Sequence, residues 1–145
     1  MIKINRKVEY ALISLKFLSE LVPGELASAS DICERYEIPY DPTSRVLQLM
    51  TKAKLLRSEH GTQGGYQIVR DLSRVTILDL SEILVGKTAI ARCITGKSCE
   101  LMKKCNIVSP LTKLNVQFID FIKQIDLKTL LESSLPISVQ EVRHG

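Results

Sequence analysis

The sequence lacks any apolar run that approaches the roughly 20 residues needed by a membrane-spanning helix. Residues 1–10 are polar and basic, without the apolar block and small-residue cleavage site of a secretion signal. We therefore expect a cytoplasmic protein that has no membrane partner. Thiols stay reduced in that compartment, so cysteines there indicate metal or redox chemistry rather than disulfide bonds.

The sequence also lacks the signatures of common enzyme classes. It has no nucleophile elbow, no Walker loop and no paired carboxylates in a plausible cleft. The glycine-rich residues 61–65 do not form a dinucleotide fingerprint, because they lie inside a predicted hairpin rather than between a strand and a helix. We expect a protein that is not an enzyme.

The first half of the chain predicts a helix-turn-helix. With 145 residues, 45% of them apolar, the chain can form one domain, or one domain plus an appendage. Apolar spacing predicts a helix over residues 6–21 with Asn5 as its cap, and Ser28 and Ser30 can cap a short second helix. Asp41-Pro42 combines a capping side chain with proline at the first helical position, which predicts a third helix to about Ala53. Two helices, a short turn and a third helix are typical of this DNA-binding motif.

A β-hairpin, the wing, is predicted directly after the third helix. Two short strand-like runs flank a glycine-rich tip. The glycines are either simple turn residues or, as we favour, positions where the backbone approaches a phosphate. Basic residues outnumber acidic ones between residues 42 and 70, which suits a polyanion, although a solvated helix face would look the same.

The predicted DNA contacts fall into three groups. Polar residues assigned to the outer face of the third helix are candidates for base edges: Thr43, Ser44, Arg45 and Gln48. Basic residues that follow are candidates for phosphates: Lys52, Lys54 and Arg57. Wing-tip residues are candidates for a flanking minor groove or backbone: His60, Gly61, Gly64 and Gly65.

The second half of the chain predicts a helix capped by Thr76, an irregular segment over residues 87–108 and a long helix that starts at Ser109-Pro110. The long helix carries one apolar stripe: Leu111, Leu114, Phe118, Phe121, Ile122 and Ile125. We interpret it as a dimerisation helix, with ordinary core packing as the alternative. The predicted fold is mainly α with a small β wing. Its parts are a winged helix-turn-helix domain (residues 1–75), a linker helix, cysteine loop and dimerisation helix (76–135), and a flexible tail (136–145).

Three cysteines are spaced evenly as Cys-x5-Cys-x5-Cys in the irregular segment: Cys93, Cys99 and Cys105. Steps of six residues rotate successive side chains by about 240° on a helix, so the sulfurs converge only if the segment is a loop. Structural zinc usually has two close cysteine pairs, and that spacing is absent. An iron–sulfur cluster is a better match but needs a fourth ligand. The remaining cysteine, Cys33, is predicted to be buried in the second helix.

These residues resemble those of the bacterial iron–sulfur winged-helix transcriptional regulators of the IscR, NsrR and RirA type. The resemblance covers roughly residues 1–135. It rests on Lys-Val-Glu-Tyr-Ala-Leu at residues 7–12, on Gly-x-x-Gly-Gly-Tyr at residues 61–66, and above all on the three-cysteine loop. It implies a homodimer in which a long helix crosses to the partner subunit.

The resemblance also implies the ligand set. Cys93, Cys99 and Cys105 fall on the family's cluster ligands, but Val108 stands where the IscR branch has a histidine. In the NsrR branch an acid from the first helix of the other subunit completes the coordination, and the matching residue is Glu9. The missing histidine favours a 4Fe–4S over a 2Fe–2S cluster.

The expected function is a homodimeric repressor that places two recognition helices in successive major grooves of a pseudo-palindromic operator in double-stranded DNA. The cluster would control operator affinity by sensing redox state, nitric oxide or iron. The alternative is a cluster-free transcriptional regulator that uses thiol redox chemistry or zinc. An electron carrier or cluster-transfer scaffold would leave the wing and the third helix without a purpose.

Overall fold

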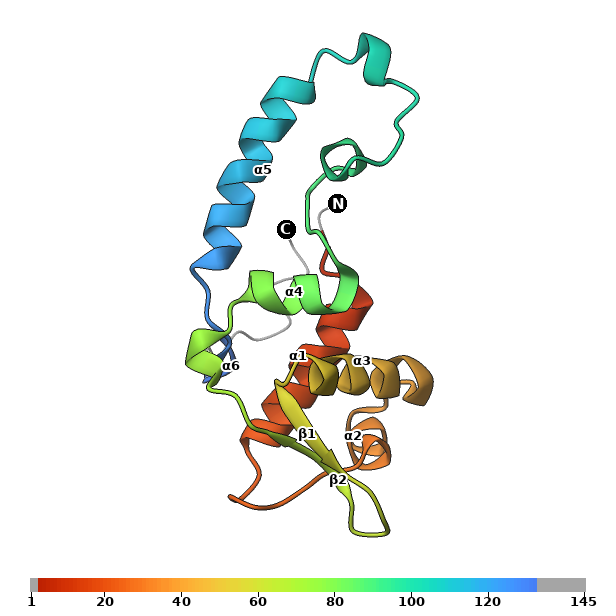
Figure 1. Ribbon diagram of the computed structural model, residues 1–145, viewed down its shortest axis with the longest axis vertical. Helices are drawn as coiled ribbons and strands as arrows, with labels where there is room; N and C mark the ends of the chain where they lie inside the picture. Colours follow the sequence, from red (N-terminus) through yellow and green to blue (C-terminus); the bar gives the residue numbers. More distant parts are fainter. Residues whose placement is uncertain (1–2, 133–145) are drawn as a thin grey trace, which may run out of the picture.

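The structure is a computed structural model, and it describes residues 3–132. The helices are α1 (Arg6–Ser19), α2 (Ala29–Tyr36), α3 (Tyr40–Lys52), α4 (Ile77–Val85), α5 (Val108–Lys123) and α6 (Leu127–Glu132). The strands are β1 (Leu56–Glu59) and β2 (Gly65–Ile68), and the short 3-10 turns are Leu72–Arg74, Arg92–Thr95 and Met102–Lys104. The predicted class, mainly α with a small β wing, is confirmed (Figure 1). The predicted tail, 136–145, lies outside the described residues.

Helices α1 and α2 form where their caps and apolar spacing predict. The side chain of Asn5 accepts a hydrogen bond from the Lys7 N–H at the start of α1. Helix α1 ends at Ser19, two residues before the predicted end. At α2, Ser28 and Asp31 form a reciprocal capping box, which satisfies backbone N–H groups that the helix itself leaves unpaired.

Helix α3 starts one residue before Asp41, so the prediction that Asp41 caps it is wrong. Pro39 is the N-cap and makes no side-chain hydrogen bond, and both Asp41 and Pro42 lie in the first turn. Proline is tolerated there because the first N–H groups of a helix have no intrahelical partner. The helix ends at Lys52, close to the predicted end.

The wing is an antiparallel hairpin whose register pairs Leu56 with Ile68 and Glu59 with Gly65. An isolated bridge joins Ala27 to Tyr66 through two backbone hydrogen bonds of 2.8 and 3.3 Å. Because Ala27 directly precedes the α2 cap, this bridge ties the wing to the helix-turn-helix.

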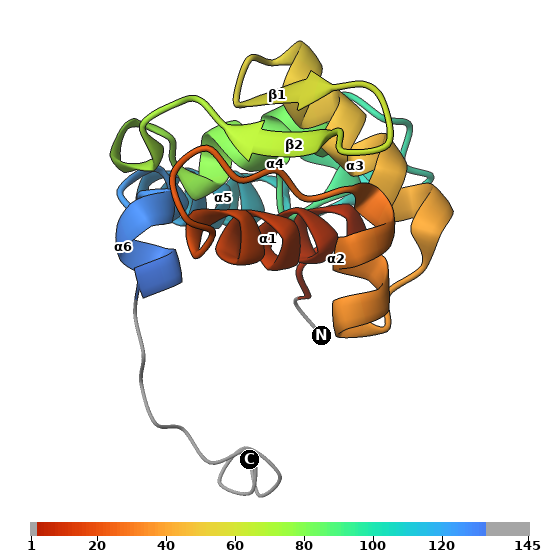
Figure 2. The ribbon, with the colours of Figure 1, turned by 90° about the horizontal axis from the view of Figure 1, so that it is seen from below.

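The core contains side chains from both halves of the chain. Buried leucines of α1, α3, α4 and α6 belong to one cluster, among them Leu15, Leu47, Leu80 and Leu127. The chain also returns to the first domain through a backbone hydrogen bond from the Leu127 N–H to the carbonyl of Val75 (2.8 Å). Figure 2 shows α6 on one side of α1, with α2 and α3 on the other. Helices α4 and α6 are therefore integral to the domain that carries α3.

Helix α5 extends away from this core, and the loop between α4 and α5 arches beyond it (Figure 1). The helix starts at Val108 with Ile107 as N-cap, so the prediction that Ser109 caps it is wrong. Of the α5 side chains only Ile122 is buried, whereas Leu114 and Phe121 are 50% and 63% exposed. No helix within residues 3–132 is long and apolar enough to cross a membrane.

Candidate nucleic-acid interface and cysteine loop

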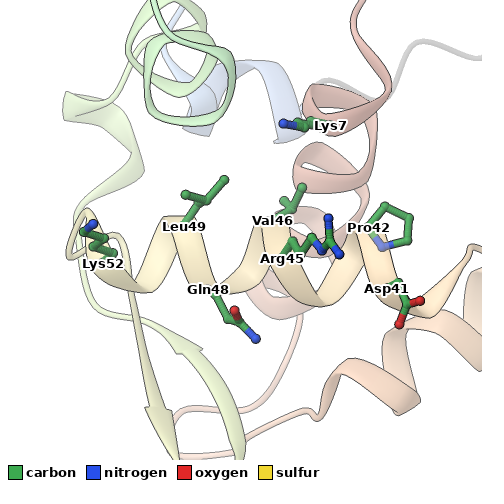
Figure 3. Close-up of a pocket in the computed structure, with 8 residues that line it drawn as sticks. All are labelled: Lys7, Asp41, Pro42, Arg45, Val46, Gln48, Leu49 and Lys52. Carbon is green, nitrogen blue, oxygen red and sulfur yellow. The ribbon is translucent and has the colours of Figure 1, made fainter.

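The outer face of α3 presents Arg45, Gln48 and Lys52 to solvent, as predicted (Figure 3). Ser44 is half-buried, and its Oγ accepts a weak hydrogen bond of 3.4 Å from Nε2 of Gln48. Neither Arg45 nor Lys52 makes an ion pair within residues 3–132. The exposed face of α3 therefore offers unpaired cations and amide groups to a ligand.

Thr43 does not belong to this face, and the prediction that it points outward is wrong. Its side chain is fully buried, and its hydroxyl donates a 2.7 Å hydrogen bond to the carbonyl of Pro39. The physical reason is spacing, because Thr43 shares one helical stripe with the buried residues Val46, Leu47 and Met50. Thr43 is consequently removed from the candidate base contacts.

Two predicted phosphate contacts, Lys54 and Arg57, have structural roles as well. Lys54 is exposed and has a φ of 59°, the left-handed conformation in which helix ends usually place glycine. Arg57 donates from Nε to Oε1 of Gln67 (2.8 Å) across the hairpin and forms a 3.2 Å ion pair with Glu59. Its charge is therefore partly neutralised by the wing itself.

Close backbone contacts within the fold require glycine at two of the wing positions. A Cβ on Gly64 would lie 2.2 Å from the carbonyl oxygen of Glu59, and one on Gly65 would lie 2.6 Å from the backbone of Ala27. Gly61 has a φ of 109°, with nothing within 4 Å of the Cβ position. Packing within the chain thus explains why positions 64 and 65 are glycine. Gly61 and His60 are exposed at the tip, where a ligand can reach them.

The predicted irregular segment is confirmed between α4 and α5, and it holds three free, half-buried cysteines. Cys93 lies in the Arg92–Thr95 turn, Cys99 lies between the turns, and Cys105 follows the Met102–Lys104 turn. No three His, Cys, Asp or Glu side chains are grouped as a metal site in the part of the chain that the structure describes. Three thiolates suit iron chemically, but their convergence on one point stays a prediction.

Glu9 lies in the first turn of α1 and is half-buried. Its carboxylate accepts a short hydrogen bond and ion pair of 2.6 Å from Arg6. The structure does not group it with the three cysteines. Cys33, as predicted, is buried in α2, at 8% exposure.

Sequence reasoning missed Lys7 as a site residue. Its side chain is exposed on α1, yet it lines the same groove as Arg45, Gln48 and Lys52 of α3. The only signal in the sequence was its place in the basic start of the chain, which does not reveal proximity to α3.

The chain is similar to known transcriptional regulators over nearly its whole length. The sequence pattern of Rrf2, described as an iron-dependent transcriptional regulator, matches residues 4–133. The HTH-type transcriptional regulator NsrR of Oceanobacillus iheyensis is 24% identical over 132 residues, which is 90% of each chain.

Solved structures share the fold. The structure of CymR (YrzC), the global cysteine regulator of B. subtilis, superposes with a TM-score of 0.71 at 17% identity, covering 93% of this chain and 100% of that chain. T. potens IscR superposes with a TM-score of 0.67 at 19% identity, covering 97% and 96%. The winged-helix fold and the resemblance drawn from the motifs are thereby confirmed.

Proposed function

The chain belongs to the Rrf2 family of iron-dependent transcriptional regulators, and from this premise we propose that it is a homodimeric, operator-binding repressor. Its DNA affinity is set by an iron–sulfur cluster held in the loop between α4 and α5. The observation that carries the proposal is the position of the three cysteines, which link the domain bearing the exposed face of α3 to the unpartnered helix α5.

DNA recognition is assigned to α3 and the wing. Arg45 can pair bidentately with a guanine, and Gln48, one turn further along, can pair with an adenine. Lys52 and Lys54 neutralise backbone phosphates, and His60 with Gly61 reaches the flanking groove or backbone. Arg57 contributes less, because Glu59 already offsets its charge.

The dimer is assigned to α5. Leu114 and Phe121, seven residues apart on one face of this helix, are 50% and 63% exposed, and burial against a second copy would remove their apolar surface from water. A twofold dimer places its two copies of α3 about one helical turn of DNA, roughly 34 Å, apart.

Cys93, Cys99 and Cys105 would hold the cluster, with Glu9 of the partner subunit as the fourth ligand. The missing histidine at Val108 favours a 4Fe–4S cluster over 2Fe–2S. A bound cluster would supply iron sites whose state responds to oxidation, nitric oxide or iron supply. The cysteine loop follows α4 directly. Leu80 and Leu84 of α4 pack in the same core as the buried residues of α3, so a change in the conformation of the loop can alter the position of α3.

A cluster-free thiol or zinc regulator is the second candidate. Its support is that the three thiols are free and partly accessible, so they can take part in redox chemistry or zinc binding without a cluster. It shares the DNA-binding face and differs only in what the cysteines do.

Purification without air tests the two candidates. We expect a brown protein with iron and sulfide in equal amounts, lost on Cys99→Ser and retained on Cys33→Ala, which removes a thiol outside the loop. A Glu9→Ala variant should lose the cluster more readily than wild type. A colourless protein with stoichiometric zinc, or with no metal, would reject the cluster, and the second candidate would stand.

A further inference from the structure

A groove of about 560 Å³ runs along one side of α3. Its floor is apolar and consists of Pro42, Val46 and Leu49, while Arg45 and Lys52 lie along its rim. Among residues 3–132, the only lining residue from outside α3 is Lys7 in the first turn of α1. Figure 3 shows the Lys7 side chain extending from α1 over the side of α3 from which Val46 and Leu49 project.

The charges around the groove are not compensated. Three cations, Lys7, Arg45 and Lys52, face one carboxylate, Asp41. None of the four makes an ion pair within residues 3–132, whereas Lys16 at the other end of α1 is paired with Glu20 at 2.8 Å. Unpaired cations around an apolar floor suit a ligand that alternates anionic groups with apolar surface.

A DNA backbone strand has this character, because its phosphates are separated by apolar deoxyribose faces. A helix in the major groove lies between two such strands. The wing strands follow the C-terminal end of α3, beyond Lys52, whereas Lys7 lies nearer Val46, in the N-terminal half of the helix (Figure 3). The wing and Lys7 thus flank α3 at different places along its length.

Resting on the DNA-binding function proposed above, we infer that the groove between α3 and the start of α1 seats one phosphodiester strand of the bound duplex. Lys7 neutralises a phosphate there, at a point separate from the backbone that the wing contacts. Operator recognition is then a two-sided clamp, with α3 reading bases between the wing and α1.

The salt dependence of binding to a random-sequence duplex of about three helical turns tests this inference. Each neutralised phosphate contributes about 0.9 to the slope of log affinity against log salt. Lys7→Gln should lower the slope by about 0.9 for each bound subunit, and Lys7→Arg should restore it. The affinity gap between Lys7→Gln and wild type should be about 3.5-fold larger at about 50 mM than at about 200 mM salt for each bound subunit, or about 12-fold for a bound dimer.

Lys16→Gln is the matched control, because it removes the same charge from the opposite end of α1. It should leave the slope unchanged, and Lys7→Gln should leave the melting temperature unchanged because Lys7 is exposed and unpaired. Equal slopes for wild type, Lys7→Gln and Lys16→Gln would overturn the clamp while leaving DNA binding intact. A wild-type protein that binds no duplex at any salt concentration would overturn both the clamp and the proposed function.

Discussion

Replacing Lys54 with glycine should stabilise the protein. The turn after α3 is a Schellman motif, in which the Leu55 N–H donates to the carbonyl of Met50 (2.9 Å) and the Lys54 N–H donates to the carbonyl of Thr51 (3.0 Å). It holds Lys54 at a φ of 59°. That conformation costs a residue with a Cβ about 1–2 kcal/mol, and glycine adds about 0.5–1 kcal/mol of unfolded-state entropy. The midpoints of the two ranges differ by about 0.75 kcal/mol, so we expect a gain of about 0.5–1 kcal/mol for Lys54→Gly.

A gain of this size corresponds to a rise of about 1–4 °C in melting temperature for a chain of this length. Thermal unfolding followed by circular dichroism measures it. Ala53→Gly is the control, because Ala53 has a φ of −78° and glycine relieves no strain there, so its melting temperature should fall. The strained-turn reasoning fails if Lys54→Gly melts at or below the wild-type temperature. The same variant should bind DNA with a shallower salt slope, because it removes a proposed phosphate contact.

Three further predictions concern the core, the wing and acid stability. Thr43→Ala should lower the free energy of unfolding by about 1–2 kcal/mol, measured with urea, because it removes a buried hydrogen bond, and it should leave base preference unchanged. Gly65→Ala should cost at least about 2 kcal/mol in the same assay, because its Cβ would overlap the Ala27 backbone; an unchanged stability would show that the wing shifts freely. Hydrogen bonds from Ser28 lower the pKa of Asp31 below its ordinary value. The stability they confer is present above the unfolded-state pKa and is lost as pH falls below about 4. The largest contribution comes from the Ser28 backbone N–H, which donates to the Asp31 carboxylate at 2.8 Å and would survive a side-chain change at Ser28. Asp31→Asn removes the titrating carboxylate and should flatten that acid loss, and an identical urea–pH profile for this variant would contradict it.

Much of the fold could be predicted because its signals are local. The caps predicted at Ser28 and Thr76 both occur in the structure, and each forms a capping box with an aspartate three residues later. The predicted caps of α3 and α5 are wrong for a physical reason. Proline is compatible with any position in the first turn, so a polar residue before proline does not fix the cap. Both helices consequently begin before Asp41 and Ser109, the residues predicted to cap them.

The candidate site was predictable only where spacing in the sequence determines which residues lie on the same face of a helix. Arg45 and Gln48 lie on the exposed face of α3 as predicted, whereas Thr43 was assigned by polarity when its spacing from Val46 and Met50 placed it inside. Lys7 approaches α3 through the packing of α1, and no local pattern encodes that approach. The convergence of cysteines six residues apart depends on how a loop folds, so their spacing alone does not determine it.

The measurement that tests the central claim most directly is the DNA affinity of one preparation before and after its iron is removed. The duplex should be selected from a random pool with protein purified without air, and the control should be Cys99→Ser treated in the same way. If the cysteine loop controls α3 through a cluster, iron removal should change wild-type affinity by about 5-fold or more, in either direction, and leave the variant unchanged. Equal wild-type affinities with and without iron would contradict the claim.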